Sequence, residues 1–194
     1  ATSNTNATVT IFNNDLPAPM ATVFSDNFDV DSSTAWNVNF GTTITNAGPP
    51  ETYSYRDRAT FAYDYSADGI PSAPHSVGGS TKGLKLEANV NTLGTALFSG
   101  LSASPIGQSF VGDFRMRVDW WPNFPGPFPG GGVGSTQLGT YGVTRGGNFA
   151  QWPGSGSPAS KDSIYFAMSG DGGTNPDIRA YTNGGAVLPT SVLA

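Results

Sequence analysis

Apolar and polar residues alternate along several short stretches of this chain, which is the pattern of a β-strand with one buried and one exposed face. Between residues 84 and 90, every even position is apolar and every odd position is polar. Similar patterns predict further strands over residues 8–12, 21–28, 34–40, 60–65, 110–121, 138–144, 163–168, 177–182 and 186–193. The chain is therefore predicted to fold mainly from short strands.

The composition also disfavours helices. Among 194 residues there are three lysines and two glutamates, so the side chains that favour exposed helices are scarce. Two stretches rich in Gly and Pro, residues 122–135 and 146–161, are predicted to be long loops. Many strands separated by turns indicate an all-β fold, namely an antiparallel two-sheet sandwich with long Gly/Pro-rich loops and minimal helix.

Charge and residue counts exclude several classes of function. The net charge is −5 and there is no run of Lys or Arg, so binding of nucleic acid through charge is excluded. No apolar stretch approaches the roughly 18 residues of a membrane-spanning helix, so no membrane insertion is expected. The chain has no cysteine and one histidine, which excludes disulfides, thiolate metal sites and zinc sites built on paired histidines.

Residues 24–36, Phe-Ser-Asp-Asn-Phe-Asp-Val-Asp-Ser-Ser-Thr-Ala-Trp, resemble the opening of concanavalin A-like domains, the lectin, glucanase and laminin-G-like jelly rolls. In these domains an aspartate-rich strand is followed by a tryptophan on the next strand. Residues 83–89 and 112–121 resemble the middle strands of the same fold. The resemblance implies a jelly-roll sandwich over residues 19–194, interrupted before its last strands, of the kind embedded in large secreted bacterial proteins.

The first 15 residues differ from the rest. Residues 7–15, Ala-Thr-Val-Thr-Ile-Phe-Asn-Asn-Asp, are similar to the final strand of a Calx-beta domain, a calcium-binding β-sandwich. This resemblance implies that residues 1–18 are a strand and linker from a preceding module, or an exchanged strand. Because strand 8–12 has no tight turn to a neighbour, we expect it to pair with another module or another copy of the chain. The acidic, Lys-poor composition favours a secreted or cell-surface location.

Three aspartates, Asp26, Asp29 and Asp31, lie within six residues. Ca²⁺ takes six to eight oxygen ligands, and such a cluster suits it. The concanavalin A-like resemblance also implies one structural calcium near this strand. The alternative is an Asx turn at an exposed strand end. Asp171 and Asp177 form a weaker second candidate, since Gly-Asp-Gly-Gly is also a common hairpin turn.

Aromatic side chains suggest a glycan site, because the apolar C–H faces of sugar rings stack on Trp and Tyr. In a strand over 110–121, alternation turns one of two adjacent tryptophans inward and places the other on the face of two arginines and Asp119. Further aromatics lie in or beside the long loops. The predicted ligand-binding residues are Trp121, Arg115, Arg117, Trp152 and Tyr141. The alternative is that these aromatics only attach the loops to the sandwich.

Catalytic groups are sparse. Glycosidases typically use two carboxylates about 5–9.5 Å apart, and the two glutamates are Glu51, in a loop, and Glu87, on a strand. Asp119 is the expected partner of Glu87. The Glu-x-Asp-x-x-Glu motif of jelly-roll glucanases does not occur in the sequence. A Ser-His-Asp site would have to use His75, but the sequence has no Gly-x-Ser-x-Gly motif that would supply the nucleophilic serine.

The sequence therefore favours a non-catalytic extracellular module that binds glycan or serves in cell-surface or matrix adhesion. Two alternatives stay open. One is a glycan-active hydrolase or lyase of the jelly-roll type that uses Glu87 with Asp119 or Glu51. The other is a purely structural subunit of a surface assembly, whose N-terminal strand joins a neighbouring module or chain.

Overall fold

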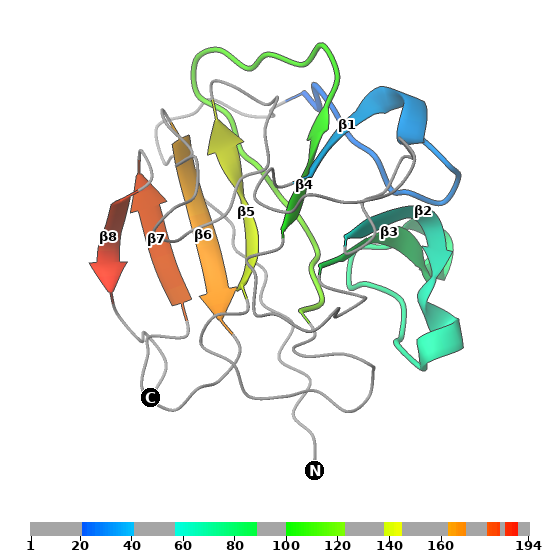
Figure 1. Cartoon of the computed structure of the whole chain (residues 1–194). Helices are drawn as coiled ribbons and strands as arrows, with labels where there is room; N and C mark the ends of the chain where they lie inside the picture. Colours follow the sequence, from blue (N-terminus) through cyan, green and yellow to red (C-terminus); the bar gives the residue numbers. More distant parts are fainter. Residues whose placement is uncertain are drawn as a thin grey trace.

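The computed structural model describes residues 21–40, 57–88, 100–122, 138–144, 163–169, 178–182 and 185–189 (Figure 1). Its strands are β1 (Trp36–Phe40), β2 (Arg58–Asp64), β3 (Lys82–Glu87), β4 (Leu101–Pro105), β5 (Leu138–Thr144), β6 (Ser163–Ser169), β7 (Ile178–Thr182) and β8 (Gly185–Pro189). Three short 3₁₀ helices accompany them: η1 (Ser33–Ala35), η2 (Tyr65–Asp68) and η3 (Val77–Gly79). The described part is all-β, and it contains no helix with the length and hydropathy needed to cross a bilayer.

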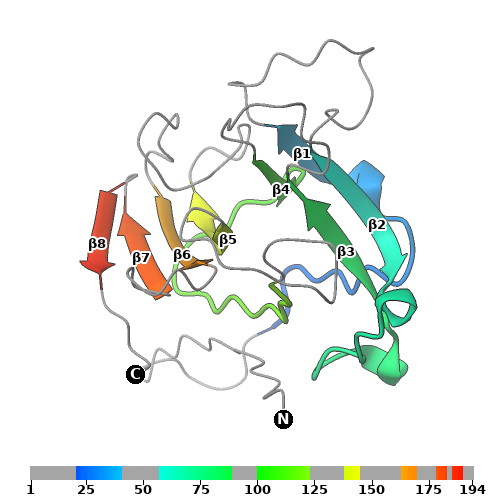
Figure 2. The same cartoon turned by 60° about the horizontal axis from the view of Figure 1, so that its bottom comes forward.

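All strand pairings in the described residues are antiparallel. Strands β5, β6, β7 and β8 follow one another in a four-stranded sheet, whereas β1 pairs with β4 and β2 pairs with β3. In both views the four-stranded sheet stands on one side of the molecule and the two strand pairs stand together on the other (Figure 1, Figure 2). Strand β4 is not predicted by the alternation, and it pairs with β1 across a long stretch of chain.

Burial follows the pleat of β6, an inner strand of the four-stranded sheet. Tyr165 and Ala167 are 6% and 1% exposed, whereas Ile164 is 54% exposed. Successive side chains of a strand point to opposite faces, so one face of this sheet is covered and the other is more open. Residues 164–168 are all apolar, so in this strand the pleat, and not an alternation in the sequence, determines which side chains are buried.

Seven predicted strands are confirmed in their described parts. Each corresponds to one observed strand, with ends that differ by a few residues: 34–40 to β1, 60–65 to β2, 84–90 to β3, 138–144 to β5, 163–168 to β6, 177–182 to β7 and 186–193 to β8. The all-β prediction is confirmed for the described residues, and nearly all of the two predicted long loops, 122–135 and 146–161, lies outside them. The predicted strand over 8–12, and with it the proposed module boundary, lies outside the described residues.

The prediction of a strand over residues 21–28 is wrong. The Asp26 carboxylate accepts a hydrogen bond from the backbone N–H of Phe28 at 2.8 Å, and Phe28 has a left-handed φ of 54°. This local turn competes with a strand ladder for the same backbone donors. Residues 21–28 therefore form an irregular lead into η1 and β1.

The prediction of a long strand over residues 110–121 is also wrong, since these residues form no strand. Gly112 bends the chain with a φ of 73°. Trp120 and Trp121 are both half-buried, so their exposure does not distinguish an inner from an outer tryptophan. Arg115 and Arg117 are exposed on this irregular segment.

Strand β2 carries one extra residue relative to β3. Thr60 is opposite Lys85 and Tyr63 is opposite Gly83, so two residues of β2 face a single residue of β3. Such a β-bulge bends the strand and changes which face the following side chains occupy. At the bulge, Ala62 has a φ of 54°, in the left-handed region that residues with a Cβ seldom adopt.

We expect Ala62→Gly to raise the free energy of unfolding by up to about 1 kcal/mol, because relief of left-handed strain exceeds the added backbone entropy of glycine. Ala62→Val should lower it by about 1–2 kcal/mol, since a β-branched side chain fits this conformation worse. Urea denaturation measures both changes.

Ala59→Gly in the same strand is the matched control, since Ala59 is not among the described residues with positive φ. There the substitution should cost about 0.5–1 kcal/mol. Equal losses at positions 59 and 62 would show that Ala62 is not strained.

Candidate functional site

One face of the β2–β3 pair gathers polar and aromatic side chains. Partners in an antiparallel pair point to the same side of the sheet, so Arg58 shares a face with Glu87, and Thr60 shares it with Lys85. The bulge turns Tyr63, three residues after Thr60, to this same face. In a regular strand, three residues would place it on the opposite face.

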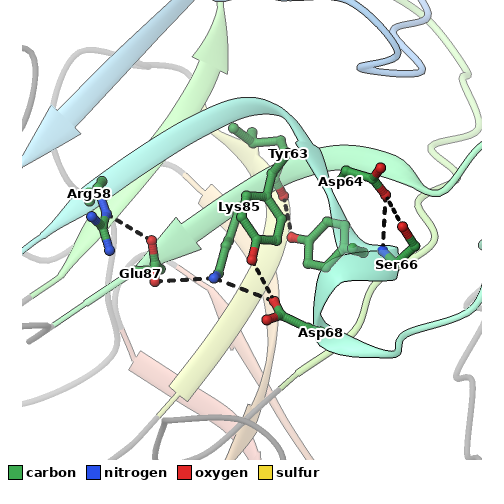
Figure 3. Close-up of polar contacts among 9 residues, drawn as sticks. Arg58, Tyr63, Asp64, Ser66, Asp68, Lys85 and Glu87 are labelled. Atoms are coloured by element: carbon green, nitrogen blue, oxygen red, sulfur yellow. Dashed lines mark hydrogen bonds and ion pairs between the residues drawn. The ribbon is translucent and has the colours of Figure 1, made fainter.

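These side chains form a continuous row of contacts (Figure 3). Arg58 Nε donates to Glu87 Oε2 at 2.9 Å, and Lys85 Nζ lies 3.3 Å from Glu87 Oε1. Lys85 Nζ also lies 3.6 Å from Asp68 Oδ2, which accepts the Tyr63 hydroxyl at 2.8 Å. Cationic and anionic groups thus alternate along what we call the polar row: Arg58, Glu87, Lys85, Asp68 and Tyr63.

Lys85 is at the centre of the polar row. Its ammonium lies 4.1 Å from the centroid of the Tyr63 ring, a cation–π distance. Burial lowers the pKa of Lys85, but the nearby Glu87 and Tyr63 outweigh burial, so the pKa is raised above its usual value. Because Arg58 is 51% exposed, its ion pair adds at most about 1 kcal/mol to folding. The main chemical consequence is a surface with fixed donors and acceptors.

Tyr65 packs against Tyr63, the aromatic member of the polar row. Its ring meets that of Tyr63 edge-on at 5.1 Å, and its hydroxyl donates to the carbonyl of Leu84 at 2.9 Å. Burial, followed by the charge of Glu87, raises the pKa of Tyr65 to about 12. A Cβ at position 83 would lie 2.9 Å from the Tyr65 ring, so Gly83 is what leaves room for it.

The short helix η2, which carries Asp68, is fixed by Asp64. The Asp64 carboxylate accepts the backbone N–H of Ser66 at 3.0 Å, the Ser66 hydroxyl at 2.6 Å and the Thr81 hydroxyl at 2.7 Å. The hydrogen bonds from Ser66 and Thr81 lower the pKa of Asp64. Gly69, at φ 72°, ends the helix in the left-handed conformation common at helix ends.

The aspartates predicted to bind calcium lie in one loop and are engaged in hydrogen bonds. Asp26 Oδ2 accepts the Ser32 hydroxyl at 2.6 Å and the Trp36 indole N–H at 2.8 Å, in addition to the Phe28 bond to Oδ1. Burial raises the pKa of Asp26, but these three hydrogen bonds outweigh burial and lower it overall. Asp26 thereby ties the loop to β1.

The two other aspartates make local contacts. Asp29 accepts the side-chain amide of Asn27 at 2.6 Å, and Asp31 accepts the backbone N–H of Ser33 at 3.0 Å, a bond that lowers the pKa of Asp31. Within the described ranges, no group of three or more His, Cys, Asp or Glu side chains is arranged to hold a metal ion. Asp171 and Asp177 lie outside those ranges. The calcium site stays a prediction.

The structure describes two of the three aromatic residues predicted to bind a ligand, Tyr141 and Trp121. Tyr141, on β5, stacks on Phe166 at 5.7 Å and meets the edge of Trp120 at 5.7 Å, and burial raises its pKa. Trp121 is half-buried at the end of the 100–122 segment. Trp152 lies outside the described residues.

The carboxylates considered for catalysis have separate partners. Glu87 is paired with Arg58 and Lys85, whereas Asp119 is bonded to His75. Burial raises the pKa of Asp119, but the hydrogen bonds from His75 and the charges of His75 and Arg117 lower it overall. Glu51 lies outside the described residues.

Sequence reasoning missed most of the polar row. It placed Lys85 on the polar side of a strand and considered Glu87 as a catalytic carboxylate, and it singled out neither Tyr63 nor Asp68. A usable signal was present, because residues 57–87 hold seven of the 23 charged residues, including two of the three lysines. In a chain with 12% charged residues, this is a marked local concentration.

No protein-family model, curated protein or solved structure matches this chain. Its function is therefore inferred from the geometry of its own residues.

We expect Asp26→Asn to lower the free energy of unfolding by about 1–2 kcal/mol, because the new amide group faces donors that need an acceptor. Thermal or urea unfolding in buffer with EDTA measures this loss without any contribution from bound metal.

Asp31→Asn is the matched control, since an asparagine at position 31 can still accept the Ser33 N–H and should leave stability unchanged. Equal effects at positions 26 and 31 would contradict the assignment of a structural role to Asp26.

Proposed function

We propose that this chain is a non-catalytic β-sandwich module of an extracellular or cell-surface protein, and that it binds glycan through the polar row. The observation that carries the proposal is the row itself, in which donors and acceptors from β2, β3 and η2 alternate beside an aromatic ring. Sugar hydroxyls both donate and accept hydrogen bonds, so such an alternation suits them. The rigid strand pair presents these groups without a loop having to become ordered on binding.

The positive and negative charges of the row are equal in number and paired, which suits a neutral glycan ligand better than a small charged ligand. Arg58 and Lys85 carry two positive charges, and Glu87 and Asp68 carry two negative ones, all within 2.9–3.6 Å of a partner. An ionic ligand would have to break one of these pairs. A hydroxyl can instead use the remaining lone pairs and protons of the same groups.

The state of the carboxylates supports a non-catalytic role. A glycosidase needs a general acid with a raised pKa beside a second carboxylate. Asp119 has a lowered pKa and is held by His75, and Glu87 is held by two cations. We therefore keep a glycan-active hydrolase or lyase as the second candidate only.

The finer features of the proposal are a jelly-roll arrangement of the two strand groups over residues 19–194, a module boundary near residue 18, a secreted or cell-surface location and a structural calcium ion. The antiparallel pairing and the two groups of strands support the jelly roll. In the alternative of a purely structural subunit, the N-terminal strand would join a neighbouring module or another copy of the chain.

We expect a glycan array to identify ligands, and Arg58→Ala or Tyr63→Phe to weaken the best of them about tenfold, the loss of roughly one good hydrogen bond. Lys82→Ala is the matched control, since Lys82 is exposed at the start of β3, opposite Asp64, and is not a member of the row. The affinity of the Lys82→Ala variant for the same glycan, measured by titration calorimetry, should equal that of the wild type.

Two outcomes would redirect the proposal. Loss of affinity in Trp121→Ala but not in the Arg58 and Tyr63 variants would move the site to the originally predicted aromatic residues. Release of reducing sugar by the wild type, abolished in Glu87→Gln or Glu51→Gln, would favour the hydrolase.

The calcium prediction has a separate test. A ligand present at a hundredfold excess over its Kd stabilises the folded state by about 2.7 kcal/mol, so EDTA should lower the melting temperature by several degrees and Ca²⁺ should restore it. Asp29→Asn should reduce this response. An unchanged melting curve, with no metal found by elemental analysis, would end the calcium hypothesis.

A further inference from the structure

The chain's single histidine joins two segments that are far apart in sequence. His75 Nδ1 lies 2.8 Å from Asp119 Oδ1, and the backbone N–H of His75 donates to Asp119 Oδ2, also at 2.8 Å. Both carboxylate oxygens are thus held by one residue, 44 positions away. The His75 side chain is 40% exposed and that of Asp119 is 13% exposed, so the ring can exchange protons with water.

His75 is held in place by its own loop. The Ser72 hydroxyl donates to the Gly79 carbonyl at 2.5 Å, and the Ser76 hydroxyl donates to the Ser80 carbonyl at 2.6 Å. The backbone N–H of Ser76 also donates to the Ala73 carbonyl at 3.0 Å. These bonds close the loop on both sides of residue 75, so the backbone that carries the imidazole has supports besides Asp119.

The segment that carries Asp119 has no strand ladder to hold it, since residues 106–122 form no regular element. The ring of the next residue, Trp120, lies 5.7 Å from the ring of Tyr141 on β5, at a steep angle to it. A Cβ at Gly139 would overlap the Trp120 ring, so this contact depends on the glycine. The His75–Asp119 contact therefore links the loop before β3 to a segment that docks on the four-stranded sheet.

The strength of this link depends on the charge of the ring. Histidine is the side chain that ordinarily changes its charge between pH 5 and 8. A neutral ring with its proton on Nδ1 donates one hydrogen bond to the carboxylate, whereas a protonated ring adds the attraction of its positive charge to that bond. Asp119 stays anionic throughout this range, with its pKa lowered, and Arg117 is the other charged group acting on it.

We propose that His75 and Asp119 form a pH-dependent clasp, which holds the segment ending in Trp120 and Trp121 more firmly against the four-stranded sheet in mild acid than at alkaline pH. Protonation of His75 tightens the clasp and loss of that proton loosens it. The clasp goes beyond the proposed function and does not depend on it, because no glycan takes part.

Hydrogen exchange tests the clasp on the full chain. After correction for intrinsic exchange rates, amides of residues 117–121 should be about two- to fivefold better protected at pH 5 than at pH 8, the range expected for a partly exposed ion pair. Fluorine NMR of the four tryptophans, labelled with 5-fluorotryptophan and assigned by Trp→Phe variants, should show the Trp120 signal shifting over the same pH range.

His75→Asn is the informative variant, because its side-chain amide can take the place of Nδ1 and its backbone N–H is retained, but it cannot titrate. In this variant the difference in protection between pH 5 and pH 8 should disappear. Asp119→Asn, which removes the anion, should abolish the difference as well. Should either variant fail to fold, the wild-type measurement still decides.

A wild type with equal or weaker protection at pH 5, or a pH dependence that persists in His75→Asn, would overturn the clasp. Neither result would bear on glycan binding by the polar row, which is measured with the Arg58 and Tyr63 variants.

Discussion

The extra residue in β2 between Thr60 and Tyr63 is the constraint on which the candidate site depends. Without it, Tyr63 would point to the other face of the sheet. Asp68 would then lose its hydrogen bond from the Tyr63 hydroxyl, and Lys85 would lose its contact with the Tyr63 ring. The bulge in turn requires the left-handed backbone of Ala62. A small departure from regular pairing thus determines which side chains meet.

The opposite side of this strand pair is attached to the rest of the chain by aromatic contacts. Phe28 lies 6.0 Å from Phe61 at the bulge and 5.3 Å from Trp36, which in turn meets Phe24 at 5.7 Å. An isolated pair of strands is marginally stable in water, so β2 and β3 need such a backing. Asp26 fixes the Trp36 indole from which these contacts extend.

The sequence predicted the features that local alternation determines and missed those set by distant partners. Strand β3 lies where the alternation predicts a strand, but its burial is the reverse of the prediction: the apolar Leu86 is 43% exposed, whereas Lys85 and Glu87 are half-buried. The irregular path of 110–121 depends on the contacts of Asp119 with His75 and of Trp120 with β5, which no local pattern encodes. Strand β4, Leu-Ser-Ala-Ser-Pro, has small side chains and owes its strand form to its pairing with β1.

The two polar arrangements differ in what perturbs them, and this follows from where their charges lie. The polar row is built within one strand pair and the adjoining helix η2, and the pairing of β2 with β3 keeps most of its members together. The His75–Asp119 contact joins separate segments. Both arrangements are partly exposed, so salt should screen both, whereas a pH change between 5 and 8 should act mainly on the clasp, which contains the histidine.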